Sequence, residues 1–530
     1  MSTPPQPRSL ISGFLRSLAA NPNRPALELG EQVLTYEELW NFAGRIAACL
    51  KQVSHSAEDV VAVLANRSVA AYGGILGILG SGRGYVPLNP KFPVERTLRM
   101  LNASGCRTVV VGKECLGTLE GLLPRLEQPL IFIFPDSGRV DLGSALHRAI
   151  SVNELKEVAN PAEPKVKPEA TAYLLFTSGS TGIPKGVAVS QANVSAYMQY
   201  AAKRFAIDAE DRCSQNFDLT FDLSVHDLFT CWDAGATLCP YPEQTLTPAT
   251  LIDEKQLTVW FSVPSVAMFA SRLGMLDPGA FPSLRWSLFC GEALSCSLAS
   301  SWQRAANNSI LENLYGPTEA TIAITYYRWD PEKSPGDCVG GLVPIGWPFE
   351  GQQVCVVDEN LSPVPKGERG ELCLGGSQVT AGYLNDPAKT AQSFVHLKHT
   401  GEKTWYRTGD LVRAGEDGCL YYMGRRDFQV KVNGYRVELQ EIDLVLREAG
   451  GTELAVAIPW PMSEGSASGI VGVLAGADPA RDPNIIAACE ARLPRYMVPN
   501  RIHHLREMPL NVNGKIDRGR IAKILSENGG

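Results

Sequence analysis

A glycine- and hydroxyl-rich segment at residues 177–186 is the part of the sequence whose composition indicates chemistry most directly. It reads Thr-Ser-Gly-Ser-Thr-Gly-Ile-Pro-Lys-Gly and follows the apolar run at 173–176. Glycines let the backbone approach a ligand with its N–H groups turned inward, and hydroxyls and a lysine add donors. This composition suits a polyphosphate, although the GxxxxGK[ST] spacing of a P-loop is absent. The alternative is an ordinary loop, which so many donors in one short segment disfavour.

Further motifs follow this segment in a fixed order. They are Tyr315-Gly316-Pro317-Thr318-Glu319, Gly370-Glu371-Leu372 with Gly382-Tyr383-Leu384, Tyr406-Arg407-Thr408-Gly409-Asp410, residues 424–431 with 434–438, residues 493–499, and residues 509–515. Together they resemble the motifs of the adenylate-forming superfamily, which includes amino-acid adenylation domains of nonribosomal peptide synthesis, acyl-CoA ligases and luciferases. The resemblance covers essentially the whole chain.

The resemblance implies a ligase that uses ATP and Mg²⁺. A carboxylate attacks the α-phosphorus of ATP poorly because both partners are negative, so the enzyme must neutralise charge and align the two groups. By resemblance, Thr318 contacts the α-phosphate, Glu319 binds Mg²⁺ and Arg425 supports the nucleotide. A glutamate oxygen suits this hard cation.

Other positions in the same motifs are implied to hold the nucleotide. They are Thr177, Ser178, Gly179, Ser180, Thr181, Gly182 and Lys185 for the phosphates, Gly291, Glu292 and Tyr315 for the adenine, and Asp410 for the ribose hydroxyls.

The resemblance makes Lys515 the catalytic residue of the first half-reaction. Its ammonium would bridge the substrate carboxylate and the α-phosphate and offset charge in the transition state. Outside its motif, Asn-Gly-Lys would indicate only a solvated turn. The superfamily rotates a small C-terminal domain between half-reactions, so Asp427 is expected at the hinge, with residues 431–434 moving towards a thiol channel. An aspartate there can equally cap a turn.

Asp222 favours an amino acid over a plain organic acid as the substrate. It lies in Phe221-Asp222-Leu223-Ser224-Val225-His226, which resembles the superfamily segment that enters the substrate pocket. A buried carboxylate needs a cationic partner, and the α-ammonium of an amino acid supplies one. The alternative is a helix N-cap before Leu223.

The wall of the substrate pocket follows from motif alignment. The implied residues are Leu223, His226, Phe261, Leu288, Cys290, Leu314, Ile322 and Ala323. This apolar set predicts a small or medium neutral side chain. The pattern is similar to stand-alone prolyl-AMP ligases, which makes L-proline the first candidate. Those enzymes usually have an aliphatic or aromatic residue at the position of His226, so alanine, serine and threonine stay open. His226 either bonds a polar substrate or packs as a neutral core histidine.

The thiol acceptor is expected on a separate peptidyl or acyl carrier protein that bears phosphopantetheine. Fifteen residues follow Lys515, and they contain no GGxS-type attachment site. An acyl- or aryl-CoA ligase of the same superfamily is the rival interpretation, and it predicts that a desamino acid is activated as well as the amino acid.

The elements that position these residues are predicted to form an α/β fold. A chain of 530 residues exceeds a single core of about 250–300 residues, so at least two domains are expected. Residues 60–64, 108–111 and 130–134 are apolar runs typical of strands buried on both faces. Residues 35–53 read as a helix with a Thr35–Glu38 capping box. A polar stretch begins near residue 424.

We therefore expect a large N-terminal domain of layered sheets and helices at 1–426, and a smaller, mobile α+β domain at 427–530. The net charge of −7 disfavours nucleic-acid or anionic-membrane binding. No apolar run approaches the length of a membrane span. The 13 scattered cysteines without metal-type spacing suggest reduced thiols, and hence a cytoplasmic protein.

Overall fold

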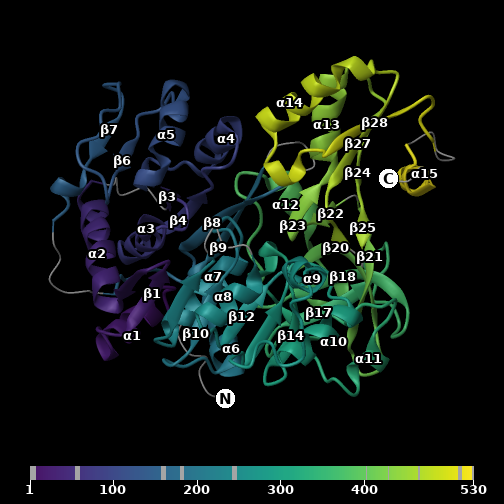
Figure 1. Cartoon of the computed structure of the whole chain (residues 1–530), viewed down its shortest axis with the longest axis horizontal. Helices are drawn as coiled ribbons and strands as arrows, with labels where there is room; N and C mark the ends of the chain where they lie inside the picture. Colours follow the sequence, from purple (N-terminus) through teal and green to yellow (C-terminus); the bar gives the residue numbers. More distant parts are fainter. Residues whose placement is uncertain are drawn as a thin grey trace.

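The structure is a computed structural model that describes residues 8–53, 60–156, 163–178, 184–241, 247–401, 403–427, 429–463, 466–510 and 516–527. Two large sheets with helices between and outside them form the first part of the chain (Figure 1). Smaller sheets follow, and the last helix, α15 (Arg518–Glu527), lies above the sheet that contains β18 (Arg369–Gly375) and β20 (Thr404–Ala414) in this view (Figure 1).

The first large sheet has seven strands and is parallel except for its last strand. In spatial order they are β7 (Arg148–Ile150), β6 (Ile131–Ile133), β5 (Thr108–Val111), β3 (Val60–Leu64), β4 (Gly84–Leu88), β8 (Thr171–Thr177) and β9 (Lys185–Ser190). In β3, Val61 and Val63 face one core, whereas Val60, Ala62 and Leu64 face another. Successive side chains alternate across a strand, so a strand covered on both faces is apolar throughout.

The second large sheet has nine strands, with a parallel centre and antiparallel edges. In spatial order they are β16 (Trp347–Pro348), β15 (Thr325–Arg328), β14 (Ile310–Tyr315), β13 (Trp286–Phe289), β12 (Val259–Ser262), β10 (Arg212–Gln215), β11 (Thr237–Pro240), β1 (Pro25–Leu29) and β2 (Gln32–Thr35).

Helices fill the space between the two sheets and cover their outer faces. The inner helices, which share one core with both sheets, are α1 (Ser12–Ala20), α2 (Tyr36–Val53), α3 (Val69–Gly80), α6 (Gln191–Phe205) and α7 (Leu223–Asp233). The outer helices are α4 (Val94–Ser104) and α5 (Leu116–Leu122) on the first sheet, and α8 (Pro248–Glu254), α9 (Pro264–Arg272) and α10 (Cys296–Ala305) on the second. Helices α2 and α3 pack closely because Gly77 has no Cβ, which would lie 2.7 Å from the carbonyl oxygen of Ala43.

A third, antiparallel sheet has five strands and adjoins the end of the second sheet. Its strands are β17 (Gln353–Val357), β18 (Arg369–Gly375), β19 (Phe394–His396), β20 (Thr404–Ala414) and β21 (Leu420–Arg425). The short helix α12 (Pro387–Ser393) connects β18 to β19, and α11 (Ser334–Asp337) connects β15 to β16 of the second sheet.

Residues 429–527 form two smaller sheets with cores of their own. The first comprises β23 (Tyr435–Glu438), β22 (Gln429–Val432), β26 (Ser466–Ala467) and β25 (Met462–Ser463), and the second comprises β24 (Ala455–Pro459), β27 (Ile470–Ala475) and β28 (Arg501–Leu505). Helices α13 (Leu439–Gly450) and α14 (Asp482–Arg492) pack on one face of the second sheet, and α15 (Arg518–Glu527) packs on the other.

The local predictions from sequence hold with one adjustment. Helix α2 starts after a capping box in which the Thr35 hydroxyl accepts from the Glu38 amide, and the Glu38 carboxylate accepts from the Thr35 amide. The strands at 60–64 and 108–111 are confirmed. The strand predicted at 130–134 is shorter, at 131–133, although the Leu130 carbonyl accepts from the Arg148 amide and the Phe134 amide donates to the Ile150 carbonyl of β7.

The mixed α/β fold class is confirmed. All 13 cysteines lie in the described residues, and none of them forms a disulfide. Within those residues, the search for a helix long and apolar enough to cross a membrane finds none.

Candidate active site

A cavity of about 90 Å³ gathers many of the residues singled out by sequence. Those that line it are Thr177, Ser178, Asp222, Leu223, Gly291, Tyr315, Thr318, Asp410 and Arg425. They come from the carboxyl ends of β8, β13 and β14, from the short turn at 318–320, from the start of α7, and from β20 and β21. A ligand site at the carboxyl ends of parallel strands is the usual arrangement in α/β folds.

The phosphate-loop segment is described at its two ends. The Ser178 hydroxyl, just past β8, donates to the Arg436 carbonyl at 2.9 Å. Lys185 begins β9, and its ammonium lies 3.2 Å from the Glu438 carboxylate. Burial lowers the pKa of Lys185, and Glu438 opposes that shift only in part. Gly179, Ser180, Thr181 and Gly182 lie outside the described residues.

Asp410 is held by two partners, one on each oxygen. The Tyr315 hydroxyl donates to one carboxylate oxygen, and the Arg425 guanidinium donates to the other. Arg425 also binds both carboxylate oxygens of Asp427, at 2.6 and 2.8 Å. Because a carboxylate has about four acceptor positions, Asp410 keeps acceptor capacity for two further donors.

Asp427 does more than cap a turn. Its carboxylate accepts from the Gln429 amide at 3.2 Å, as a cap would, while the bidentate pair with Arg425 ties it to the end of β21. Burial favours the acid form, but Arg425 outweighs it and keeps the pKa of Asp427 below its ordinary value.

Glu319 lies in a short 3-10 turn at 318–320 and is almost fully buried. The Tyr383 hydroxyl donates to one of its oxygens at 2.7 Å, and Arg436 binds the other at 3.0 Å. Burial pushes the pKa of Glu319 up, yet Arg436 and Tyr383 outweigh it and leave the pKa below its ordinary value. The side chain is therefore an ionised carboxylate.

An ionised, buried carboxylate beside a phosphate-type loop fits Mg²⁺, which binds through one or two carboxylates and substrate phosphates. The described residues contain no cluster of three or more His, Cys, Asp or Glu side chains that could hold a metal alone. Glu319 would thus be one ligand, and the phosphates of a bound nucleotide would supply others.

The structure separates the two interpretations of Asp222. Although Asp222 directly precedes α7, its side chain makes no capping hydrogen bond to the helix. It accepts instead from the Ile322 amide at 2.9 Å and borders the cavity. Burial raises the pKa of Asp222 to about 6. The side chain is poised as an anion that a ligand cation would stabilise.

The segment opposite Asp222 is strained and held in place by a buried amide. Thr321 and Ile322 both have positive φ, 57° and 72°, which is unusual for β-branched residues. The Gln378 side-chain amide donates to the carbonyls of Ala320, Thr321 and Ala323. These bonds fix the backbone so that the Ile322 amide points at Asp222.

Of the predicted pocket wall, only Leu223 borders the cavity. The remaining members are almost completely buried and packed together: His226, Phe261, Leu288, Cys290, Leu314, Ile322 and Ala323. Burial raises the pKa of the Cys290 thiol to about 12, so it is protonated.

His226 packs as a neutral core histidine. Burial lowers its pKa to about 3. Its Nδ1 lies 2.7 Å from the Tyr197 hydroxyl, and its ring meets Phe205 and Phe261 edge to face. The two alternatives that the sequence left open for His226 are thereby distinguished in this structure. The polar contact of the ring is to a protein side chain, Tyr197 on α6.

Glu292 does not border the cavity, unlike its neighbour Gly291. Its carboxylate accepts from the Ser265 amide at 2.7 Å and from the Gly434 amide at the tip of the β22–β23 hairpin. The close fit at that tip needs a glycine, because a Cβ on Gly434 would lie 2.6 Å from Val263.

Lys515 lies outside the described residues. The residues beside its segment, Leu510 and Ile516, pair with each other. Ile516 packs on the α15 face of the second small sheet, and the β22–β23 hairpin packs with the opposite face.

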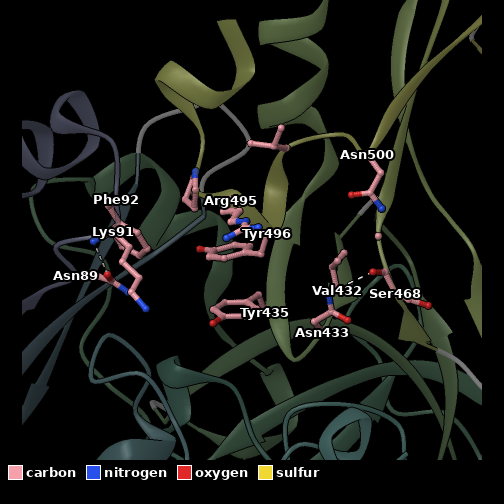
Figure 2. A pocket seen from close by; sticks show the side chains of 13 residues that line it. Asn89, Lys91, Phe92, Val432, Asn433, Tyr435, Ser468, Arg495, Tyr496 and Asn500 are labelled. Atoms are coloured by element: carbon pink, nitrogen blue, oxygen red, sulfur yellow. Dashed lines mark hydrogen bonds between the residues drawn. The ribbon is translucent and has the colours of Figure 1, made fainter. Parts of the chain in front are cut away.

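The structure adds cavity residues that sequence analysis did not select as site residues. They include Thr408, Arg436 and Tyr496, whose ring stacks on Tyr435 (Figure 2). Lys431 and Gly434 also border the cavity, and they belong to the segment 431–434 that the sequence analysis expects near a thiol channel. Arg436 and Glu438 meet Glu319 and Lys185, which are more than 100 residues away in the chain. The sequence signal that could have indicated them is their spacing. Two charged residues that are two positions apart on a strand lie on the same face.

Three comparisons bear on this site. A model of the family described as "AMP-binding enzyme" matches residues 14–384. Phosphinothricin tripeptide synthetase PhsC of Streptomyces viridochromogenes is 33% identical over 99% of this chain, but the chain spans 46% of that relative. It spans 6% and 7% of the next two curated relatives.

Other relatives match over nearly their full length. The D-alanine–D-alanyl carrier protein ligase of Bacillus licheniformis is 29% identical, covering 97% of this chain and 98% of the relative. The crystal structure of the Vibrio cholerae adenylation domain AlmE in complex with glycyl-adenosine-5'-phosphate has a TM-score of 0.87 and 34% identity, covering 98% of each chain.

The raised pKa of Asp222 predicts that Asp222→Asn stabilises the ligand-free protein at neutral pH. A folded pKa of about 6 against an ordinary value of 3.8 means that ionisation costs up to about 3 kcal/mol of folding free energy. That cost is present above pH 6 and disappears as the pH falls below about 4, where the group is protonated folded and unfolded alike. Thermal unfolding should show the variant more stable at pH 7.5 and equal to wild type near pH 4. A variant destabilised equally at both values would contradict the buried-anion interpretation.

Proposed function

The chain belongs to the family of AMP-binding enzymes, which are adenylate-forming ligases, and from this premise we propose that it activates a small neutral amino acid with ATP and Mg²⁺ and transfers it to the phosphopantetheine thiol of a separate carrier protein. The observation that carries the proposal is Asp222: a buried carboxylate that borders the cavity, caps no helix and forms no ion pair within the described residues.

The described residues that we assign to the first half-reaction have surroundings that suit their proposed roles. Asp222 receives the α-ammonium, and Asp410 receives the ribose hydroxyls with its remaining acceptor positions. Glu319 supplies an oxygen to Mg²⁺, which would neutralise phosphate charge. Thr318 lies at the cavity wall beside Glu319 and contacts the α-phosphate. Lys515 bridges the substrate carboxylate and the α-phosphate.

The second half-reaction uses a different position of the C-terminal residues. We place the domain boundary and hinge at Asp427, dividing 1–426 from 427–530. Here the β22–β23 hairpin lies against the cavity, with Lys431, Gly434 and Arg436 on its border. This arrangement is the one expected after rotation, when Lys515 has withdrawn and a thiol approaches the acyl group.

The proposed amino acid has a small side chain. Most of the predicted wall is closely packed in this structure, and Leu223 alone borders the cavity beside Asp222. This packing favours side chains no larger than the ring of proline. L-proline, favoured by the motif pattern, and alanine, serine and threonine remain the candidates, and glycine joins them because the AlmE structure contains a glycyl adenylate.

ATP–pyrophosphate exchange over a panel of amino acids and their desamino analogues tests the proposal. Exchange is expected with a small neutral amino acid and at least 100-fold less with the matching desamino acid, because breaking a buried ion pair costs about 3–5 kcal/mol. Equal exchange with both would favour an acyl- or aryl-CoA ligase. Transfer to a phosphopantetheinylated carrier protein is followed by intact-protein mass spectrometry.

Replacing Lys515 should separate the two half-reactions. The variant Lys515→Ala is expected to lose adenylate formation by about 10²–10³-fold, since it removes the cation that offsets transition-state charge. Its thermal unfolding should match that of wild type. Transfer from a chemically prepared aminoacyl-adenylate to the carrier should continue at a near-normal rate. Full exchange activity in this variant would contradict the proposed mechanism.

Enlarging the wall should broaden substrate choice. His226→Ala removes a large ring, and Tyr197→Phe in the same chain avoids leaving a buried hydroxyl without its partner, which would cost about 1–3 kcal/mol. The double variant should raise relative kcat/KM for valine or leucine by about 10–200-fold per accommodated methylene. Tyr197→Phe alone is the control, because it removes the hydrogen bond without adding space. Unchanged preference in the double variant would place His226 outside the pocket wall.

A further inference from the structure

Two buried ion pairs join strand β23 to the groups proposed to hold Mg²⁺ and the phosphates. Arg436 lies 3.0 Å from Glu319, the proposed metal ligand. Glu438 lies 3.2 Å from Lys185, at the end of the phosphate-loop segment. The side chain of Glu319 is 1% exposed, and those of Glu438 and Lys185 are 7% and 11% exposed. Water screens such pairs little.

The hairpin presents these two charges together. Arg436 and Glu438 are two residues apart on β23, so they share one face, while Val437 between them faces the core on the other side. Gln429 on β22 stands opposite Glu438 in the register. Its side-chain amide donates to Glu438 and accepts from Arg436. Gln429 thus holds Arg436 and Glu438 together as a fixed pair of opposite charges.

Each charge on the hairpin has the sign of the ligand expected at its partner. A guanidinium on Glu319 supplies the positive charge that a divalent cation would supply. A carboxylate on Lys185 supplies the negative charge that a phosphate would supply. Glu319 has its other oxygen bound by Tyr383, and the hydroxyl of Ser178 is bonded to the Arg436 carbonyl.

We propose that Arg436 and Glu438 take over the charge positions of Mg²⁺ and pyrophosphate, so that the hairpin docks only after both have left. The inference rests on the proposed function in taking ATP as the substrate. With the metal bound, Arg436 would face a second cation at Glu319, and with phosphate bound, Glu438 would face a second anion at Lys185. Like charges repel strongly at such distances in a buried site. Docking for the second half-reaction therefore follows release of the first product.

Hydrogen exchange of the segment 429–438 measures docking directly. The Gly434 amide in this segment is bonded to Glu292 only when the hairpin is docked as here. Mg²⁺ with inorganic pyrophosphate is the probe, its binding is followed by calorimetry, and Mg²⁺ alone is the blank. Saturating probe should speed exchange of this segment about tenfold, within the range of ordinary coupling between sites.

Two outcomes distinguish a failure of this inference from a failure of the proposed function. If the probe binds and exchange in 429–438 stays the same, the charge-exchange inference is overturned while the proposed function stands. If neither pyrophosphate nor ATP binds under any condition, the proposed function fails and the inference fails with it.

A matched pair of variants tests the charges themselves. Glu438→Gln removes the carboxylate on Lys185. Glu441→Gln removes a different buried ion pair between the same two parts, with Arg96 on α4 at 2.8 Å. Both should raise basal exchange. Glu441→Gln should keep the response to pyrophosphate, and Glu438→Gln should lose most of it. A full response in Glu438→Gln, or equal loss in both variants, would overturn the inference.

Discussion

Burying a charge without a partner costs several kcal/mol, and this constraint organises the cavity. Asp410 is paired with Arg425, Glu319 with Arg436, and Lys185 with Glu438. Asp410 and Arg425 stand opposite each other on neighbouring strands of the third sheet. The other two pairs join residues more than 100 positions apart, so the fold must hold distant segments in fixed relation for those charges to balance. Within the described residues Asp222 makes no such pair, and its raised pKa records the cost. A cationic ligand would remove that cost, because its binding would give the buried Asp222 carboxylate a partner of opposite charge.

Much of the fold could be predicted, because the sequence patterns that indicate its helices and strands lie within a few consecutive residues. The Thr35–Glu38 capping box lies within one helical turn, and the apolar runs at 60–64 and 108–111 report two buried faces. The ends of the strand at 131–133 were less predictable, because the buried Leu130 and Phe134 on either side of it still form hydrogen bonds to β7. The order of strands in the sheets depends on packing between distant segments and could not be read from periodicity.

Part of the candidate site could likewise be predicted from the sequence, and part of it could not. Motifs were enough to select Asp222, Asp410 and Arg425, which the fold brings to one cavity. Whether Asp222 caps α7 depends on where its side chain points, and only the structure answers that. The partners of Glu319 and Lys185 come from residues 117 and 253 positions away. The sequence identifies Arg436 and Glu438 as charged residues, but their contacts depend on how the hairpin docks.

The volume of the cavity supports the proposed movement of the docked hairpin. About 90 Å³ remains with β22 and β23 in place, whereas pockets for small molecules and cofactors occupy about 300–1,000 Å³. ATP and an amino acid together cannot enter the smaller space. The hairpin itself supplies Lys431, Gly434 and Arg436 to the border, so its withdrawal would both enlarge the site and free Glu319 and Lys185 from their partners. The cavity volume and the buried charges therefore favour the same proposed order, in which these two ion pairs are open when ATP enters.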